Sequence, residues 1–410
     1  MSATETTPVS TPEERATLSA AAAEFTRREI APHLQAWEDE GRVPRELHRK
    51  AADAGLMQVG FPESVGGFGG GLLDTIAVQE GMFGAGASSG LMSALFTHGI
   101  ALPHIAAHGS AYLVDRYLRP TLAGELIGSL GVTEPGGGSD VGAITTRAER
   151  VAGPDGEPCY LVNGAKTFIT SGTRADFVTT AVRTGGPGAA GVSLLVVPTD
   201  APGFTVDRGL AKMGWHCSDT AELSFVDVLV PATHLVGEEN AGFWYIAEQF
   251  VVERIALAVH GYGIAERALA LTVEHCRQRA TFGQPLVSRQ VVRHKLVEMR
   301  RQVEVARTYV HAVAEQYVAA GGPNPDVIAR ACLAKQTACE AAAYVCDQAV
   351  QLHGGAGYMH GTEVERHYRD ARLLPIGGGA TEVLTDLAAK LLGYSEGSTH
   401  TDRSTDRGAR

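Results

Sequence analysis

Residues 248–264 read EQFVVERIALAVHGYGI, a helix-forming stretch that is apolar on nearly all sides except for Glu253 and Arg254 in its middle. A helix that is apolar all round is a buried helix, and a buried carboxylate is costly unless it is paired or hydrogen-bonded. Neighbours in sequence project about 100° apart on a helix, so these two side chains do not face each other. Two interpretations are open from this stretch alone: an ion pair with another helix, or a carboxylate kept for chemistry.

The composition is that of a globular protein and excludes several classes of partner. The chain has 410 residues, of which 44% are hydrophobic and 20% charged, enough for two or three domains. The net charge of −11, without a basic block, argues against nucleic acid. No run reaches the roughly 18 uncharged apolar residues that a membrane span needs. Residues 1–14 (MSATETTPVSTPEE) resemble neither a secretory signal nor a transit peptide, so we expect a cytoplasmic protein.

The cysteines indicate core positions in a reducing compartment. No CxxC pattern occurs, and we predict no metal site. Small apolar packing suits all six of them, namely Cys159, Cys217, Cys276, Cys332, Cys339 and Cys346.

Hydrophobic periodicity changes twice along the chain and predicts a mainly α protein with a central β domain. Residues 1–127 have a helical pattern with a glycine-rich loop at 66–71, and 128–237 alternate β-branched runs with turn residues, as in a compact antiparallel β domain. Residues 238–395 return to the helical period and predict a four-helix bundle, while 396–410 predict a disordered tail. A heptad stripe runs through Val292, Leu296, Met299, Val303, Ala306, Val310, Val313 and Tyr317.

A glycine-rich string, TEPGGGSD at 133–140, marks the entry to the β domain. Consecutive glycines let backbone N–H groups approach a ligand, and the flanking Thr133 and Ser139 add hydroxyl donors. The string alone fits a simple turn equally well. Neither GxGxxG after a strand nor GxxxxGKS occurs, which excludes Rossmann and P-loop sites.

Four further strings follow in order: KTFITSG at 166–172, MGWHCSDT at 213–220, RATFG at 279–283 and QLHGGAGY at 351–358. Their order and spacing resemble the acyl-CoA dehydrogenase family over about residues 12–395. The resemblance implies a three-domain fold, a homo-oligomer of tetrameric type, non-covalent FAD and α,β-dehydrogenation of acyl-CoA to the trans-2-enoyl-CoA. It also implies an electron-transfer flavoprotein as the redox partner.

The resemblance assigns flavin contacts residue by residue. Val132, Thr133 and Ser139 match the pyrimidine and ribityl contacts, Phe168 the residue against the isoalloxazine, and Thr170 the donor to flavin N5. Arg279, Phe282 and Gln290 match the positions that hold the adenosine and diphosphate end. Gln351, Gly354 and Gly355 would reach the FAD of a neighbouring subunit, and Glu382 matches a further flavin contact.

The chain departs from the common family pattern at residues 376–382, IGGGATE. Many members carry the catalytic glutamate in this stretch, but here glycine occupies its place at 378. Glu253-Arg254 is similar to the pair that isovaleryl-CoA and long-chain acyl-CoA dehydrogenases place on the long helix, which predicts Glu253 as the base. The resemblance implies that the Gly378 N–H binds the thioester carbonyl. It assigns substrate contacts to Ser139, Phe250, Arg254 and Gly379.

Glycines near the predicted site leave the acyl group open. Gly377, Gly378, Gly261 and Gly263 fit either close packing or a pocket for branched, long or cyclic acyl chains. Two alternatives to the acyl-CoA reaction also remain: a dehydrogenase of carrier-protein-bound thioesters, and a flavin-binding relative without turnover. A monooxygenase is disfavoured because it would not need a carboxylate at 253.

Overall fold

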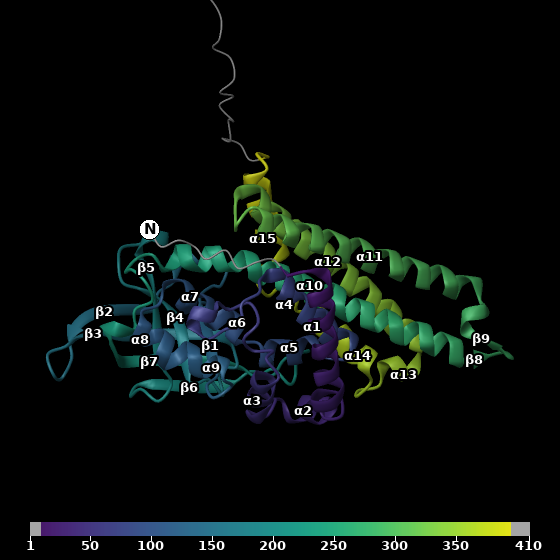
Figure 1. Cartoon of the computed structure of the whole chain (residues 1–410), viewed down its shortest axis with the longest axis horizontal. Helices are drawn as coiled ribbons and strands as arrows, with labels where there is room; N and C mark the ends of the chain where they lie inside the picture. The colour runs from purple at the N-terminus through teal and green to yellow at the C-terminus, as the bar shows by residue number, and fades with distance from the viewer. Residues whose placement is uncertain (1–9, 395–410) are drawn as a thin grey trace, which may run out of the picture.

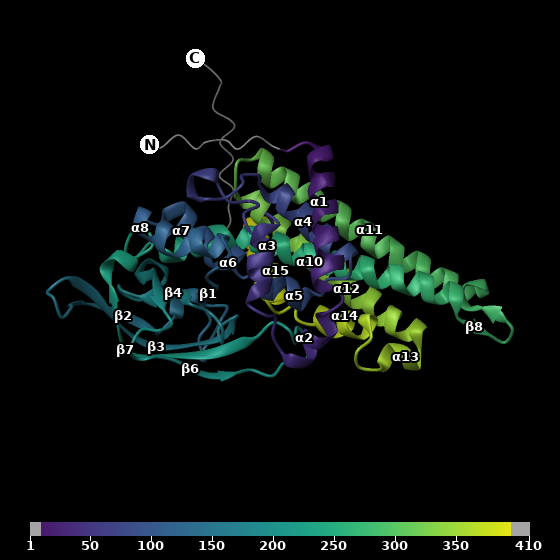
Figure 2. The same ribbon diagram turned by 60° about the horizontal axis from the view of Figure 1, so that its bottom comes forward.

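The computed structural model describes residues 10–394. Along the sequence, helical regions precede and follow a seven-stranded sheet. In space the sheet lies at one end of the molecule, and the long helices extend away from it (Figures 1 and 2). Helices come first, strands second and long helices last, which confirms the predicted fold class. The predicted disordered tail at 396–410 lies outside the described residues.

The N-terminal region is a set of short helices. The first, α1 (Pro12–Phe25), begins with a capping box in which Thr11 and Glu14 exchange side-chain and backbone hydrogen bonds. The glycine-rich segment 66–71 lacks regular structure and leads into α4, as predicted. The helices after α1 are α2 (Leu34–Glu40), α3 (Glu46–Asp53), α4 (Leu72–Gly84), α5 (Ser89–Leu95), α6 (His98–Ala101), α7 (Pro103–His108), α8 (Ala111–Leu113) and α9 (Arg119–Leu122).

The central sheet is mainly antiparallel, as predicted, but it is mixed, because two of its pairings are parallel. β1 runs parallel to β4, its neighbour in the sheet, and the β2–β3 hairpin separates these two strands in the sequence. β2 also meets β4 in parallel, and every other pairing is antiparallel. The strands are β1 (Gly128–Gly131), β2 (Arg147–Ala152), β3 (Pro158–Thr170), β4 (Phe177–Arg183), β5 (Val192–Pro198), β6 (Phe204–Gly209) and β7 (Thr220–Pro231), ordered β1-β4-β2-β3-β7-β6 with β5 beside β4.

The C-terminal region is built on long helices that pack side by side. They are α10 (Gly242–Gln278), α11 (Gln290–Ala319) and α12 (Pro325–His353), with α15 (Thr381–Leu391) against α12. The predicted stripe on α11 is buried from Val292 to Val313, with Leu296 and Tyr317 partly buried. Between α12 and α15 lie α13 (Gly355–Tyr358) and α14 (Glu363–Ala371). A small hairpin, β8 (Ala280–Thr281) and β9 (Gln284–Pro285), joins α10 to α11.

α10 connects the sheet with the bundle. At its start Gly242 lies against the backbone of Ser193 and Leu194 in β5, where a Cβ would have no room. At its end the β8–β9 hairpin projects at the opposite end of the molecule from the sheet, in both views (Figures 1 and 2). The single helix therefore spans from the sheet to the far end of the bundle.

The six cysteines are buried and unpaired. Among the described residues, no single helix is long and apolar enough to cross a membrane, although the bent pair Ser89–Leu95 and His98–His108 passes on length and composition alone.

Candidate active site

Glu253 lies in the first third of α10 and faces the turn between α14 and α15. Its Oε1 is 3.4 Å from the point that a Cβ on Gly378 would occupy. The side chain is partly accessible, and no described residue forms a hydrogen bond or ion pair with its carboxylate. Burial raises the pKa of this carboxyl, against the opposing effect of the Arg254 and Lys335 cations. A carboxylate that is partly desolvated and free of partners can accept a proton.

The turn at 377–379 explains why position 378 carries no side chain. Gly378 and Gly379 have φ angles of +62° and +98°, in the left-handed region that favours glycine. A Cβ on Gly378 would overlap Cδ1 of Leu257, and one on Gly379 would lie 2.8 Å from Cδ2 of Leu384. A glutamate at 378 would need this turn and its neighbours to move, so the carboxylate at this place comes from α10.

The backbone N–H of Gly378 has no hydrogen-bond acceptor among residues 10–394, whereas the ends of the turn are closed. Gly377 N donates to Leu373 O at 2.9 Å, and Thr381 N donates to Pro375 O at 3.0 Å. The structure thus brings Glu253 and Gly378 together, the one with a free acceptor and the other with a free donor.

Arg254 points to a different environment from Glu253. Its side chain is 8% exposed, its Nε has no acceptor among the described residues, and its guanidinium lies 6.0 Å from the ring centroid of Phe250. Neither Glu253 nor Arg254 forms a salt bridge with any described residue. The ion pair with another helix, which the sequence left open, is therefore not formed within residues 10–394.

Phe168 is held in a strained conformation on β3. Its φ of +59° is rare for a bulky residue, and its ring is 68% exposed. It lies in the irregular register of β3 and β7 between Lys166 and Ile169. Strain kept at an exposed aromatic residue is typical of a ligand contact. Thr170 ends the same strand, and its hydroxyl has no partner among the described residues.

The TEPGGGSD loop is anchored by a buried ion pair that sequence reasoning missed. Glu134 Oε1 lies 2.8 Å from Lys166 Nζ, and its carboxylate also accepts from Thr145 and from the Thr146 N–H. Burial alone would raise the pKa of Glu134, but Lys166 and these donors lower it to about 2. Burial lowers the pKa of Lys166 to about 8.

This anchor holds the predicted loop residues in place around open space. Lys166 also donates to the carbonyl of Val132, and Thr133 O accepts from Thr167 N. Beyond the anchor Ser139 is exposed, and a Cβ on Gly136 or Gly137 would meet no atom within 4 Å. The chain's own packing does not need those two glycines, which fits the close approach of a ligand.

The remaining predicted cofactor residues lie far from the sheet. Arg279 and Phe282 are exposed at the β8–β9 hairpin, and Phe282 is 97% exposed. The end of α12 lies beside them, because the rings of His275 and His353 stack with centroids 4.2 Å apart. The structure therefore groups Arg279, Phe282 and Gln290 with Gln351, Gly354 and Gly355, all at the far end of the bundle (Figure 1).

Lys335 is a second functional candidate that the sequence analysis missed. It lies on α12, is 2% exposed, and donates to the carbonyls of Gly377 and Gly379. The signal was present: Lys335 is the single charge in the mainly apolar run ACLAKQTAC between Arg330 and Glu340, the same argument that selected Glu253.

Two other placements complete the comparison with the predictions. Glu382 is exposed in the first turn of α15, directly after the glycine turn. Gly261 and Gly263 serve helix packing, since a Cβ on them would lie 2.8 Å from Ala338 O and 2.6 Å from the Phe83 ring. They therefore do not widen an acyl pocket.

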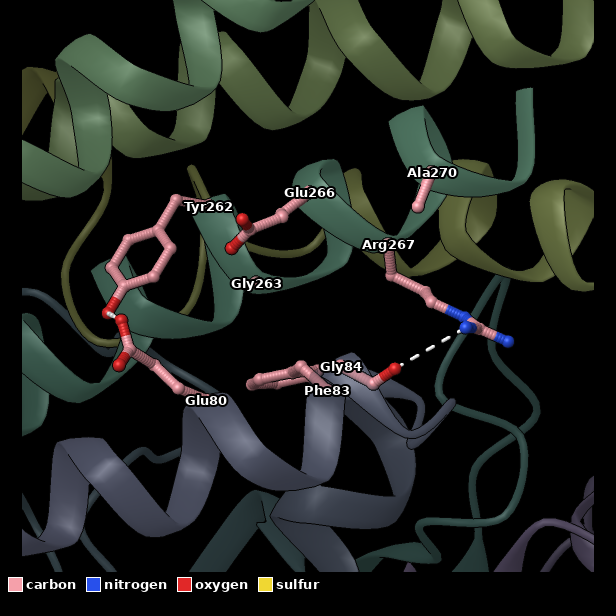
Figure 3. A pocket seen from close by; sticks show the side chains of 8 residues that line it. All are labelled: Glu80, Phe83, Gly84, Tyr262, Gly263, Glu266, Arg267 and Ala270. Carbon is pink, nitrogen blue, oxygen red and sulfur yellow. Dashed lines mark hydrogen bonds between the residues drawn. The ribbon is translucent and has the colours of Figure 1, made fainter. Parts of the chain in front are cut away.

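A separate cavity of about 190 Å³ lies between α4 and α10 (Figure 3). Tyr262 donates to Glu80 across it at 2.9 Å, and Arg267 donates to Gly84 O at 3.3 Å. Gly263 is one of the residues that line this cavity, and none of the predicted catalytic, cofactor or substrate contacts lines it.

Three family models match the chain in order: the N-terminal domain of acyl-CoA dehydrogenases at 11–125, the middle domain at 129–228 and the C-terminal domain at 240–393. The mitochondrial long-chain specific acyl-CoA dehydrogenase of Rattus norvegicus is 36% identical over 369 residues, covering 89% of this chain and 83% of that protein.

Two solved structures extend the comparison. A probable acyl-CoA dehydrogenase from Mycobacterium abscessus has a TM-score of 0.90 at 58% identity, covering 94% of this chain and all of that one. The prolyl acyl carrier protein oxidase AnaB has a TM-score of 0.86 at 26% identity, with 94% of this chain and 100% of that one covered. Full-length matches of this kind, over all three domains, show that the chain belongs to the acyl-CoA dehydrogenase family and is a flavoprotein oxidoreductase acting on acyl-CoA.

Proposed function

We propose that the chain catalyses α,β-dehydrogenation of a saturated acyl-CoA, with Glu253 as the base that removes the α-proton. One observation carries this proposal: the carboxylate of Glu253 lies beside Gly378, and neither that carboxylate nor the Gly378 N–H has a hydrogen-bond partner among residues 10–394. A proton acceptor and a carbonyl-binding donor at that spacing suit a thioester whose α-carbon lies between them.

In this mechanism the Gly378 N–H binds the thioester oxygen, and Glu253 takes the α-proton. The N–H stabilises the negative charge that develops on the oxygen as the proton leaves. Partial burial supports Glu253 as the acceptor, because it raises the pKa of the carboxyl. When bound, FAD supplies the redox chemistry by accepting the β-hydrogen as a hydride. The product is the trans-2-enoyl thioester.

The residues of the β domain fit a flavin. Phe168 offers an exposed aromatic face, Thr170 a free hydroxyl, and the open loop around Ser139 free backbone donors. Val132, Thr133 and Glu382 complete this proposed contact set.

The second set of proposed flavin contacts implies a homo-oligomer. It stands at the hairpin end of α10, whose 37 residues span about 55 Å. Glu253, the proposed base beside the flavin, lies 26 residues before Arg279, about 39 Å along this helix. That span is longer than one FAD. We therefore infer that Arg279, Phe282, Gln290, Gln351, Gly354 and Gly355 serve the FAD of a neighbouring subunit. A tetramer and an electron-transfer flavoprotein as acceptor remain proposals from the family resemblance.

Anaerobic mixing with acyl-CoA tests the base. In wild type we expect bleaching of the flavin absorbance, and in Glu253→Gln a rate about 10²–10⁴-fold lower. Glu248→Gln is the matched control, because Glu248 is exposed on the same helix. Bleaching in Glu253→Gln at the wild-type rate would remove Glu253 from the mechanism.

A carrier-protein thioester is the second candidate substrate, favoured by the similarity to AnaB. The same acyl group should be presented on CoA and on a phosphopantetheinylated carrier protein, and the two values of kcat/KM compared. A clear preference for the carrier protein would replace the acyl-CoA proposal without changing the roles of Glu253 and Gly378.

A further inference from the structure

Lys335 is a buried cation without a carboxylate partner. It is 2% exposed on α12, and no described residue forms a salt bridge with it. Burying an ammonium group is costly unless its protons are well used. The atoms that Lys335 contacts therefore indicate what it is for.

Both of its hydrogen bonds go to the glycine turn. Lys335 Nζ donates to the carbonyl of Gly377 at 2.5 Å and to that of Gly379 at 2.7 Å. These two carbonyls stand on either side of Gly378 in the sequence. The lysine thus fixes the centre of the turn, whose ends are closed by the backbone bonds of Gly377 and Thr381 and by the Thr381 hydroxyl, which also donates to the Pro375 carbonyl.

Fixing the Gly377 carbonyl also fixes the Gly378 N–H. The two groups belong to one planar trans peptide unit, in which C=O and N–H point in opposite directions. An ammonium that holds the oxygen on the α12 side therefore turns the N–H away from α12. That N–H, like those of Gly379 and Ala380, has no acceptor among the described residues.

The same hydrogen bond polarises the peptide. A charged donor on the carbonyl oxygen withdraws electron density through the amide, which makes its N–H a stronger donor. We propose that Lys335 is a positioning residue, which aims and polarises the Gly378 N–H for the thioester oxygen of the substrate. This inference rests on the proposed function.

The charge of Lys335 also acts on the proposed base, Glu253. The titratable and charged groups around it are Glu253 and Arg254 from α10 and the thiols of Cys332 and Cys339 from its own helix. Its positive charge lowers the pKa of Glu253 against the larger effect of burial. Removing that charge should therefore move the acid limb of kcat/KM to higher pH.

Lys335→Met, which keeps the length of the side chain and removes its charge and donors, tests the proposal. The control is Lys390→Met, because Lys390 is exposed on α15. With flavin bound, we expect kcat to fall about 10–100-fold, with a much smaller change in KM. Infrared difference spectra with a ¹³C-labelled thioester carbonyl should show its stretching band moved to higher frequency, because the carbonyl is less polarised.

A wild-type kcat and carbonyl band in flavin-loaded Lys335→Met would overturn the proposal. Where that variant fails to fold, Lys335→Gln is measured instead, since an amide keeps one donor without the charge. We expect intermediate values of kcat and band position for it, and wild-type values would again overturn the proposal.

The outcome separates this inference from the proposed function. If Glu253→Gln bleaches the flavin at the wild-type rate, the proposed function fails whatever Lys335→Met does. If Glu253→Gln is impaired and Lys335→Met behaves as wild type, the inference about Lys335 fails alone.

Discussion

Two glutamates in this molecule each have a different buried lysine nearby, and they differ in hydrogen bonding and in pKa. Glu134 bonds to Lys166 at 2.8 Å and accepts three further hydrogen bonds from Thr145 and Thr146. Glu253 has Lys335 and Arg254 nearby but bonds to neither. The pKa of Glu134 falls to about 2, and that of Glu253 rises.

The difference shows what separates a structural carboxylate from a reactive one. Direct donors make the ionised form of Glu134 stable, so it anchors a loop and does not take a proton near neutral pH. At Glu253 neither neighbouring cation bonds to the carboxylate. Lys335 donates to the glycine turn instead, and Arg254 Nε has no acceptor among the described residues. Burial without donors leaves the proton affinity of Glu253 high.

The largest expected effect on stability comes from breaking the anchored pair. Glu134→Gln leaves the Lys166 ammonium buried without its counter-charge, and we expect a loss of about 3–5 kcal/mol. Thermal unfolding monitored by circular dichroism should show it, with the exposed Glu149→Gln on β2 as control. Adding Lys166→Met should recover part of the loss. Equal melting temperatures for Glu134→Gln and Glu149→Gln would contradict the comparison.

The next effect tests why the base is absent from the turn. Gly378→Ala places a Cβ against Leu257 and holds alanine at a φ of +62°. We expect a loss of about 1–3 kcal/mol in stability, with lower kcat because the 378 N–H is displaced. Gly99→Ala is the control, since Gly99 is exposed on α6 and its Cβ would lie in open space. A Gly378→Ala protein as stable and active as the control would show that the turn is looser than described.

The smallest effect contrasts the two carboxylates by pH. The folded pKa of Glu134 lies at about 2, below the ordinary glutamate pKa of 4.5, so its stabilisation is present above pH 4.5 and is lost as pH falls toward 2. Glu253 has the opposite sign: its raised pKa makes the ionised form unfavourable in the fold, so Glu253→Gln should be at least as stable as wild type at pH 7. Melting temperatures of both variants between pH 3 and 8 check the signs, and a large destabilisation by Glu253→Gln would refute the contrast.

Local patterns in the sequence predicted much of this molecule. The heptad stripe of α11, the apolar helix around Glu253 and the motif order were sufficient for the fold class, because each depends on neighbouring residues alone. The pairing of Glu253 with Gly378 came from the missing glutamate at 378 together with a charge in an apolar helix. In the structure Glu253 and Gly378 lie side by side.

Features that depend on distant contacts escaped the sequence. The parallel pairing of β1 with β4 joins two strands that the β2–β3 hairpin separates in the sequence. Likewise, the positive φ of Phe168 depends on the register of two strands. The role of Lys335 depends on hydrogen bonds to two carbonyls that are 42 and 44 residues away in the sequence. The packing of Gly261 against Ala338 and of Gly263 against Phe83 could not be predicted from the sequence either. The sequence therefore left open whether these glycines line an acyl pocket.

The length of α10 has a genetic consequence. On the proposal that the hairpin end of one chain completes the flavin site of another, a defect at Arg279 and a defect at Glu253 fall in different halves of each active site. Two inactive proteins, one carrying each change, would then restore some working sites when expressed together. In a mixed assembly, sites formed by a chain with an intact base and a neighbour with an intact hairpin carry neither defect. Two recessive alleles of this one gene, each inactive alone, would therefore show intragenic complementation.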